Sequence, residues 1–455
     1  MRKYSMKKNL TFKETIFVAS MLFGMFFGAG NLIFPVSMGQ MAGRSMWQAA
    51  VGFLITGVGL PLLGVAALGV SRQNGLLEVS SRVGKRYGVF FTCVLYLTIG
   101  PFFAIPRCAT VSFSVGVEGM LPGGGSTVAL AVFSLLFFAA VLFFSLRPGK
   151  ILVWIGKILN PLFLCFLAVL VLRALFSPMG EAGAMEPVEA YASQSFFTGF
   201  LEGYNTMDAL AGLAFGIIVV NVIRGLGVEE PGAVAKSTVK AGIFSSILMA
   251  VIYILVTVVG AQSREMMGIS ENGGLTLSGI AEYYFGKAGA FLLAATVTLA
   301  CLKTAVGLIT SCGETFEGMF PKGPSYRVWA VAFCLLSFGI ANLGLNTIIA
   351  YSLPVLMFLY PLAITLILLT LCGRFFGNDL RIYRWVTVFT AAAALVDFIN
   401  ALPAEAQRVL HLQGFAETAG NFLPFSEQGF GWLCPALIGF VIGAVHCRIR
   451  RRDSV

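Results

Sequence analysis

The sequence has 455 residues, of which 58% are hydrophobic and 11% are charged, with 31 Lys and Arg against 21 Asp and Glu. Soluble domains carry about 25% charged residues, so this chain has too few charges to cover a water-exposed surface. An ordinary soluble enzyme is therefore excluded. The net charge of +10 has no hydrophilic domain on which to form a nucleic-acid-binding surface, so we expect no nucleic acid partner.

Apolar runs separated by turn signals predict an all-α membrane protein of about twelve transmembrane helices, each long enough to cross about 30 Å of hydrocarbon. In chain order we expect these helices at 12–36, 47–70, 89–117, 127–146, 150–175, 195–224, 237–260, 286–313, 326–344, 347–372, 383–402 and 428–447. The whole chain, residues 1–455, then forms a single transport domain surrounded by membrane lipid.

The basic residues predict the orientation of these helices. Of the 31 Lys and Arg, 23 fall on the side of the N-terminus, five fall on the opposite side and three lie within spans. Loops on the cytoplasmic side carry an excess of basic residues. We therefore expect a multi-pass protein of the bacterial cell (inner) membrane with both termini in the cytoplasm.

The first span contains the unusual stretch MFFGAGNLIFP, in which Gly28, Gly30 and Asn31, together with the preceding Gly24, interrupt an apolar run. A dinucleotide-binding loop is excluded, because the third glycine and a preceding strand are missing. Two interpretations remain for this span alone. Gly24 and Gly28 form a GxxxG helix-packing motif, or the helix is interrupted to line a cavity.

The sixth span favours the second interpretation, because it places polar and acidic residues in another apolar run. The stretch GFLEGYNTMDALAG contains Glu202, Asn205 and Asp208, and a carboxylate at mid-membrane is costly and usually functional. Two interrupted helices five spans apart are typical of inverted-repeat transporters. We expect two repeats of opposite orientation, helices 1–5 within residues 1–175 and helices 6–10 within 195–372, with two appended helices at 383–447.

Four stretches resemble signature segments of the branched-chain amino acid:cation symporters, the BrnQ-type (LIVCS) carriers. They are FFGAGNLIFP, GPFFAIPRCATVSF, GYNTMDALAG and ACLKTAVGLITSCGE, and the similarity continues to LPFSEQGFGWLCPALIG near the C-terminus. The resemblance implies uptake of leucine, isoleucine and valine driven by a sodium gradient, on the inverted-repeat fold of the sodium-coupled leucine transporters, with discontinuous helices 1 and 6. No organic cofactor is implied.

The resemblance and the two interruptions together give the candidate site. The substrate carboxylate would meet free amides and a cation in helix 1, the amine would meet oxygens in helix 6, and an apolar pocket would hold the side chain. The candidate substrate residues are Phe27, Gly28, Ala29, Gly30, Asn31, Phe102, Phe103, Gly203, Tyr204, Asn205 and Asp208. The candidate sodium ligands are Gly24, Phe27, Asn31 and Thr304.

Two residues depart from the family pattern that the resemblance implies. Lys303 lies where an uncharged residue is typical, and Ser114 lies where an acid is typical. The Lys303 ammonium group at a cation site can replace the sodium ion, since a buried lysine is able to release its proton. The alternative is a structural role, through an ion pair with an in-span acid.

The sequence leaves more than one role possible for the remaining polar residues. Arg107, Glu202 and Glu314 are candidates for gating or for ion pairs. His411 and His446 lack metal-ligand spacing.

The alternative functions are a same-fold carrier coupled to protons or to no ion, a carrier of another small neutral amino acid, or a channel. A membrane enzyme is a further alternative, but no catalytic motif supports it. Exposed helix faces look alike to lipid and to a partner protein, so the sequence predicts no oligomeric state.

Overall fold

The protein was analysed as a computed structural model, which describes residues 9–28, 30–71, 73, 75–120, 127–147, 150–412, 414 and 422–452. The described residues form helices and connecting turns, with no strand among them. Eight of these helical segments are long and apolar enough to cross a membrane, and three shorter apolar helices accompany them. The chain is thus an all-α multi-pass protein, as the composition predicts.

The helices follow the expected spans closely. The first half of the chain contains α1 (Phe12–Phe26), α2 (Gly30–Ala42), α3 (Met46–Leu54), α4 (Leu60–Ser71), α5 (Leu76–Ser80), α6 (Lys85–Leu97), α7 (Ala104–Gly116), α8 (Thr127–Leu146) and α9 (Lys150–Phe176). Two π-helical segments join α3 to α4 and α6 to α7, η2 (Ile55–Gly59) and η3 (Thr98–Phe102).

The second half begins with α10 (Tyr191–Glu202), the short 3-10 helix η5 (Gly203–Thr206) and α11 (Asp208–Gly225). It continues with α12 (Pro231–Met267), α13 (Gly273–Met319), α14 (Tyr326–Ala341), α15 (Leu345–Cys372), η6 (Gly373–Phe376), α16 (Leu380–Ala401), α17 (Ala404–Val409), η7 (Ser426–Gln428) and α19 (Leu433–Arg452). The helix α13, which contains the eighth predicted span at 286–313, is longer than that prediction, because a helical segment from Gly273 precedes the span. Gly286 separates the two parts with a φ of 63°.

Both interruptions predicted from the sequence are present. The first span divides into α1 and α2, with Phe27 in an extended conformation (φ −72°, ψ 100°) between them. The sixth span divides into α10 and α11 through η5 and Met207, which adopts the left-handed conformation (φ 61°). A non-glycine residue is uncommon there, so the chain holds this turn against a local preference.

Spans 1, 2, 6 and 7 pack against one another through glycines. A Cβ atom at Gly39 would overlap the backbone of α12 at Thr257, and one at Gly260 would overlap α2 at Val36. A Cβ at Gly52 would overlap α10, and one at Gly199 would overlap α3. Such close backbone contact requires glycine, and these four spans therefore form one tightly packed bundle.

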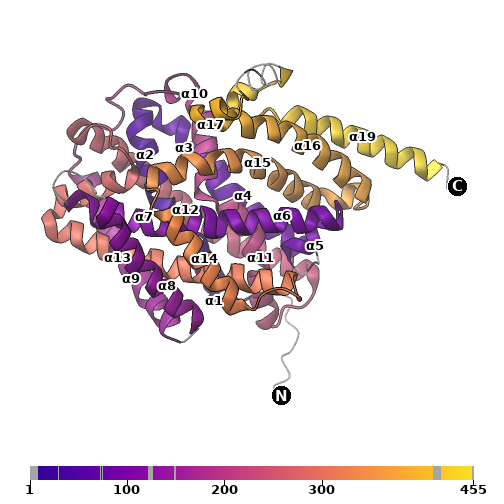
Figure 1. Cartoon of the computed structure of the whole chain (residues 1–455), viewed down its shortest axis with the longest axis horizontal. Helices are drawn as coiled ribbons and strands as arrows, with labels where there is room; N and C mark the ends of the chain where they lie inside the picture. Colours follow the sequence, from indigo (N-terminus) through magenta and orange to yellow (C-terminus); the bar gives the residue numbers. More distant parts are fainter. Residues whose placement is uncertain are drawn as a thin grey trace.

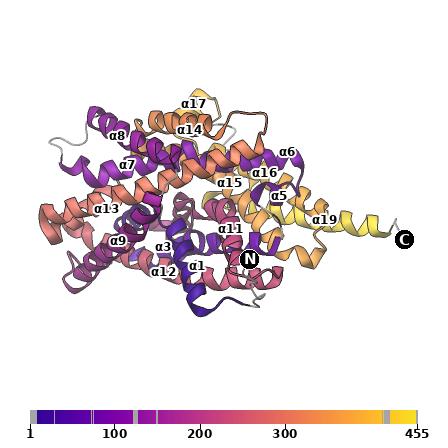
Figure 2. The same ribbon diagram turned by 90° about the horizontal axis from the view of Figure 1, so that it is seen from below.

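The helices outside this bundle surround it unevenly. The long helix α13 packs along α7, and Ser114 of α7 donates a hydrogen bond of 2.8 Å to Asn272 Oδ1, the N-terminal cap of α13. The last two helices, α16 and α19, pack on each other, and α19 projects from the body of the molecule (Figures 1 and 2).

Candidate functional site

A hydrogen-bonded cluster joins the two interrupted helices at the centre of the molecule. Asn31, at the start of α2, donates through Nδ2 to Asp208 Oδ2 at 2.6 Å and to the hydroxyl of Tyr253 on α12. Tyr253 also donates to Asp208 Oδ2, at 3.2 Å. All three side chains are buried, with exposed fractions of 3% or less. Residues 177 positions apart thus form one polar centre.

Asn31 also stabilises the interruption of the first span. Its Oδ1 accepts a hydrogen bond of 2.8 Å from the Gly28 amide. In a continuous helix this amide would donate to the carbonyl of Gly24, four residues earlier. The Asn31 side chain therefore takes the place of a helical partner, and the Gly24 carbonyl loses its helical donor.

A cavity of about 70 Å³ lies beside this cluster. Its polar lining includes Arg107, Asp208 and Thr304, and the glycines Gly28 and Gly30 open onto it. Its apolar walls are Met25, Phe26, Ile99, Ala104, Ala211, Phe215 and Leu308. A guanidinium, a carboxylate and an apolar wall therefore line one space, which we call the central cavity.

Arg107 is held in place by neutral acceptors. It donates to the Asn205 backbone carbonyl and, at 3.1 Å, to Ser352 Oγ. Its guanidinium lies 5.0 Å from the centre of the Phe34 ring, and its Nε has no hydrogen-bond partner. No described acid forms an ion pair with it, so its charge is available to a ligand in the central cavity.

The other helix-6 candidates lie around η5. Asn205 Nδ2 donates to Glu202 at 3.3 Å, and Glu202 is half-buried at the end of α10. Tyr204 is fully buried and stacks on Tyr360, with ring centres 3.9 Å apart. Gly203 packs against Thr56 of the second span, so Tyr204 and Gly203 support the site from behind the central cavity.

The structure places several expected residues away from the central cavity. Phe27 stacks on Phe23 at 4.8 Å, Phe102 is 37% exposed, and neither Phe102 nor Phe103 lines this cavity. Glu314 is exposed on α13. Ala29 falls outside the described residues.

The candidate cation ligands lie on two neighbouring helices. Thr304 lines the central cavity, and its Cγ2 would lie 3.8 Å from a Cβ atom at Gly28. Gly24 lies in the last turn of α1. Lys303 is half-buried on α13, and no described residue forms a hydrogen bond or ion pair with it.

Tyr253 and the apolar walls are the site residues that sequence reasoning missed. Tyr253 lies in the run MAVIYILV, where a tyrosine resembles one anchoring the helix at the membrane interface. Ile99, Phe215 and Leu308 lie in runs of mostly apolar residues, so periodicity gives little signal for their inward face.

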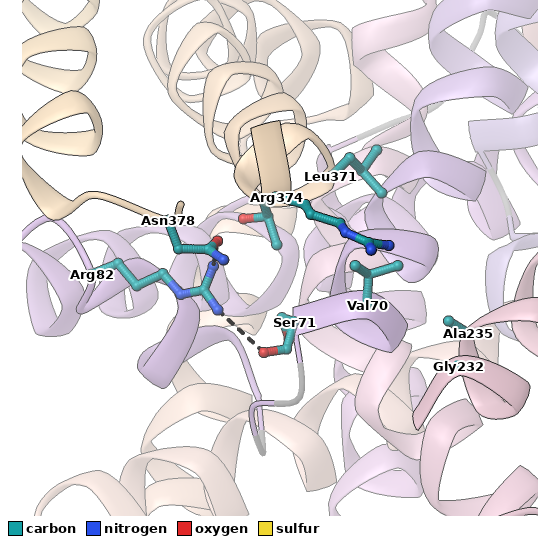
Figure 3. A pocket seen from close by; sticks show the side chains of 9 residues that line it. Val70, Ser71, Arg82, Gly232, Ala235, Leu371, Arg374 and Asn378 are labelled. Carbon is teal, nitrogen blue, oxygen red and sulfur yellow. Dashed lines mark hydrogen bonds between the residues drawn. The ribbon is translucent and has the colours of Figure 1, made fainter. Parts of the chain in front are cut away.

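A second cavity of about 650 Å³ lies at another end of the bundle, between α4, α12 and α15. Arg82 and Arg374 line it, and Figure 3 shows Arg82 turned toward Asn378 and Ser71. Arg82 donates to the Ser71 carbonyl at 3.2 Å and to the Tyr383 hydroxyl at 3.0 Å. These bonds connect the end of α4 to the α15–α16 turn, and none of the expected site residues lies there.

Comparisons with known proteins show the family of this chain. The profile of a family described as "Branched-chain amino acid transport protein" matches residues 11–450. The chain is 53% identical to a "Branched-chain amino acid permease BrnQ" of Lactobacillus delbrueckii subsp. lactis, over 99% of this chain and 100% of that protein. It is 42% identical to a permease of the same description in Bacillus subtilis, again over 99% and 100%.

Two solved structures share the fold at low sequence identity. Mhp1, a nucleobase-cation-symport-1 family transporter, matches with a TM-score of 0.61 and 15% identity, over 95% of this chain and 92% of that one. MhsT in complex with L-phenylalanine matches with a TM-score of 0.53 and 16% identity, over 98% and 99%. The chain therefore has the fold of the LeuT-type transporters.

Proposed function

Because this chain belongs to the branched-chain amino acid transport protein family, and is thus a transporter rather than an enzyme, we propose that it imports leucine, isoleucine and valine by sodium-coupled symport. The import would cross the bacterial cell (inner) membrane. The 23 to 5 distribution of basic residues supports placing both termini in the cytoplasm.

The central cavity is the observation that supports this function most strongly. Arg107 and Asp208 line it together with apolar side chains. An aliphatic amino acid carries a carboxylate, an ammonium group and an apolar side chain, and each has a complementary group here. We assign the ammonium group to Asp208, and the carboxylate to Arg107 and the amides at Gly28 and Gly30.

The apolar wall sets the expected selectivity. An apolar pocket separates substrates that differ by one methylene by only about 1–3 kcal/mol. Leucine, isoleucine and valine should therefore all compete for uptake.

Sodium would bind between helix 1 and helix 8. The donor set fits a monovalent cation, because the Gly24 and Phe27 carbonyls, Asn31 Oδ1 and Thr304 Oγ1 are all neutral oxygens. The loss of the helical donor at Gly24 supports this placement. A bound cation there would supply positive charge near the substrate carboxylate.

Lys303 supports a second candidate, a carrier of the same fold in which the ammonium group replaces sodium. It is half-buried next to Thr304 and has no described ion-pair partner. Transport would then be independent of sodium and coupled to protons or to no ion.

Leucine uptake into proteoliposomes with an imposed sodium or proton gradient separates the two candidates. Sodium-coupled symport predicts concentrative uptake only with sodium, in the wild type and in Lys303→Thr alike. Sodium-independent uptake in the wild type, with sodium dependence appearing in Lys303→Thr, would establish the second candidate. The absence of saturable uptake would contradict both.

Alternating access would follow from the glycine-packed bundle of spans 1, 2, 6 and 7, moving against the remaining helices. The division into repeats at 1–175 and 195–372 is part of the same proposal. In this view each repeat contributes one interrupted helix to the central cavity.

A further inference from the structure

A third cavity, with a polar lining, is bordered by η5 on the side predicted to be outside the cell. It has a volume of about 390 Å³ and lies between α10, α15, α16 and η7. Its polar lining includes the acids Glu202, Asp397 and Glu427 together with neutral side chains such as Asn205 and Asn400, and no lysine or arginine is among the described lining residues. We call this space the antechamber.

Two buried acceptors in the antechamber have no partner. Asp397 is 2% exposed and its Oδ2 makes no hydrogen bond, and Asn205 is 4% exposed and its Oδ1 makes none. Both residues line the cavity. Buried polar groups are nearly always hydrogen-bonded, so these two oxygens indicate a ligand that donates hydrogen bonds and carries positive charge.

The position of the antechamber connects it to the central cavity. Asn205 and Thr206 are consecutive in η5, and Asn205 lines the antechamber while Thr206 lines the central cavity. Arg107, which lines the central cavity, donates to the Asn205 carbonyl. One layer of residues therefore separates the two spaces.

The lining chemistry favours an organic ammonium ion over a metal ion. No group of three or more His, Cys, Asp or Glu residues among those described is arranged to hold a metal. The antechamber also has an apolar wall of Phe197, Leu201, Leu353 and Met357. This wall would accommodate an aliphatic side chain next to the acids.

We propose that the antechamber is a second binding site, which captures the ammonium group of an incoming aliphatic amino acid before it reaches the central cavity. Asp397 and Asn205 Oδ1 accept its hydrogen bonds, and Glu202 adds negative charge. The inference rests on the proposed transport function. It adds Asp397 on α16, outside the two interrupted helices, to Glu202 and Asn205 of the sixth span.

The test uses 3-methylbutylamine, which is leucine without its carboxylate, as an inhibitor of radiolabelled leucine uptake by the full-length protein. Asp397→Asn should raise the inhibitory concentration of the amine about tenfold, the effect of losing one charge-assisted hydrogen bond. It should also lower uptake at low leucine concentration, while the equilibrium dissociation constant of leucine stays within about twofold of the wild-type value. 4-Methylpentanoate, which lacks the amine, should show no dependence on residue 397.

Two further variants control for misfolding and for charge. Asn400→Lys places a fixed ammonium group in the antechamber from an exposed position, so it should reproduce the loss of amine inhibition without disturbing the core. Glu405→Gln removes an exposed acid from α17, outside the lining, and should behave as the wild type.

Equal amine inhibition in the wild type, Asp397→Asn and Asn400→Lys would overturn the proposal. A change in the sodium dependence of Asp397→Asn, with unchanged amine inhibition, would overturn it in favour of an inorganic cation. The difference in calorimetric amine affinity between the wild type and Asp397→Asn tests the antechamber independently of transport, because Asp208 is the same in both proteins. This measurement therefore tests the antechamber even if the wild type does not transport leucine.

Discussion

Asp208 is a carboxylate at the centre of a membrane protein, and its neighbours are neutral donors rather than a cation. Asn31 and Tyr253 both donate to its Oδ2. Two neutral hydrogen bonds partly offset the cost of burying the charge. In the proposed function, the ammonium group of the substrate supplies the positive charge that these neutral donors lack.

A substitution at Gly28 should change substrate binding without changing the stability of the fold. A methyl group there would lie 3.6 Å from Asn31 Oδ1 and 3.8 Å from Thr304 Cγ2, which are ordinary contacts. Gly28→Ala should therefore keep the wild-type melting temperature. Because the methyl group projects into the central cavity, the dissociation constant of leucine should rise about tenfold or more.

Calorimetry of leucine binding, with a thermal melt on the same sample, checks this prediction. Gly318→Ala is the matched control, since a Cβ atom at Gly318 meets nothing within 4 Å. Unchanged leucine affinity in Gly28→Ala would place the substrate elsewhere.

At the scale of elements, the interruptions were predictable and the shape of the cavity was not. Glycine, asparagine and acids inside apolar runs are costly in a continuous membrane helix, so their positions marked both breaks. The aromatic pair Phe102 and Phe103 was expected to line the pocket, but Ile99 and Ala104 line it instead. Gly100, with φ −107° and ψ −123°, and Pro101 distort the helix there, which changes the face that the following residues present.

The contact between α2 and α12 gives a prediction about packing. In Gly39→Ala the new methyl group would also lie 2.9 Å from the Ala261 amide nitrogen, and backbone cannot move away as a flexible side chain can. Overpacking of this kind costs about 1–3 kcal/mol, so the melting temperature and the yield of monodisperse protein should both fall.

Gly307→Ala on α13 is the matched control for this contact, because nothing lies within 4 Å of its added Cβ. Alanine is favoured over glycine within a helix by about 0.5–1 kcal/mol, so this variant should melt at the wild-type temperature or above it. If both variants melted alike, the close contact between α2 and α12 would be wrong.

For the whole molecule, composition alone predicted the class, and the positions of the apolar runs predicted the helices to within a few residues in most spans. The helical segment before Gly286 was not predicted, because its polar sequence with a glycine pair is typical of a loop. Asn272 caps this segment, since its Oδ1 accepts hydrogen bonds from the Gly274 and Leu275 amides. The antechamber could not be predicted from the sequence either. Asp397 and Asn205 are 192 residues apart, and only the fold brings them to the same cavity.

The central claim is that one amino acid binds where the two interrupted helices meet. An experimental structure of the full-length protein with leucine bound tests it most directly. We expect leucine in the central cavity, with its ammonium group on Asp208 and its carboxylate toward Arg107 and Gly28. Leucine bound instead in the cavity lined by Arg82 and Arg374, with no leucine in the central cavity, would rule out binding between the interrupted helices.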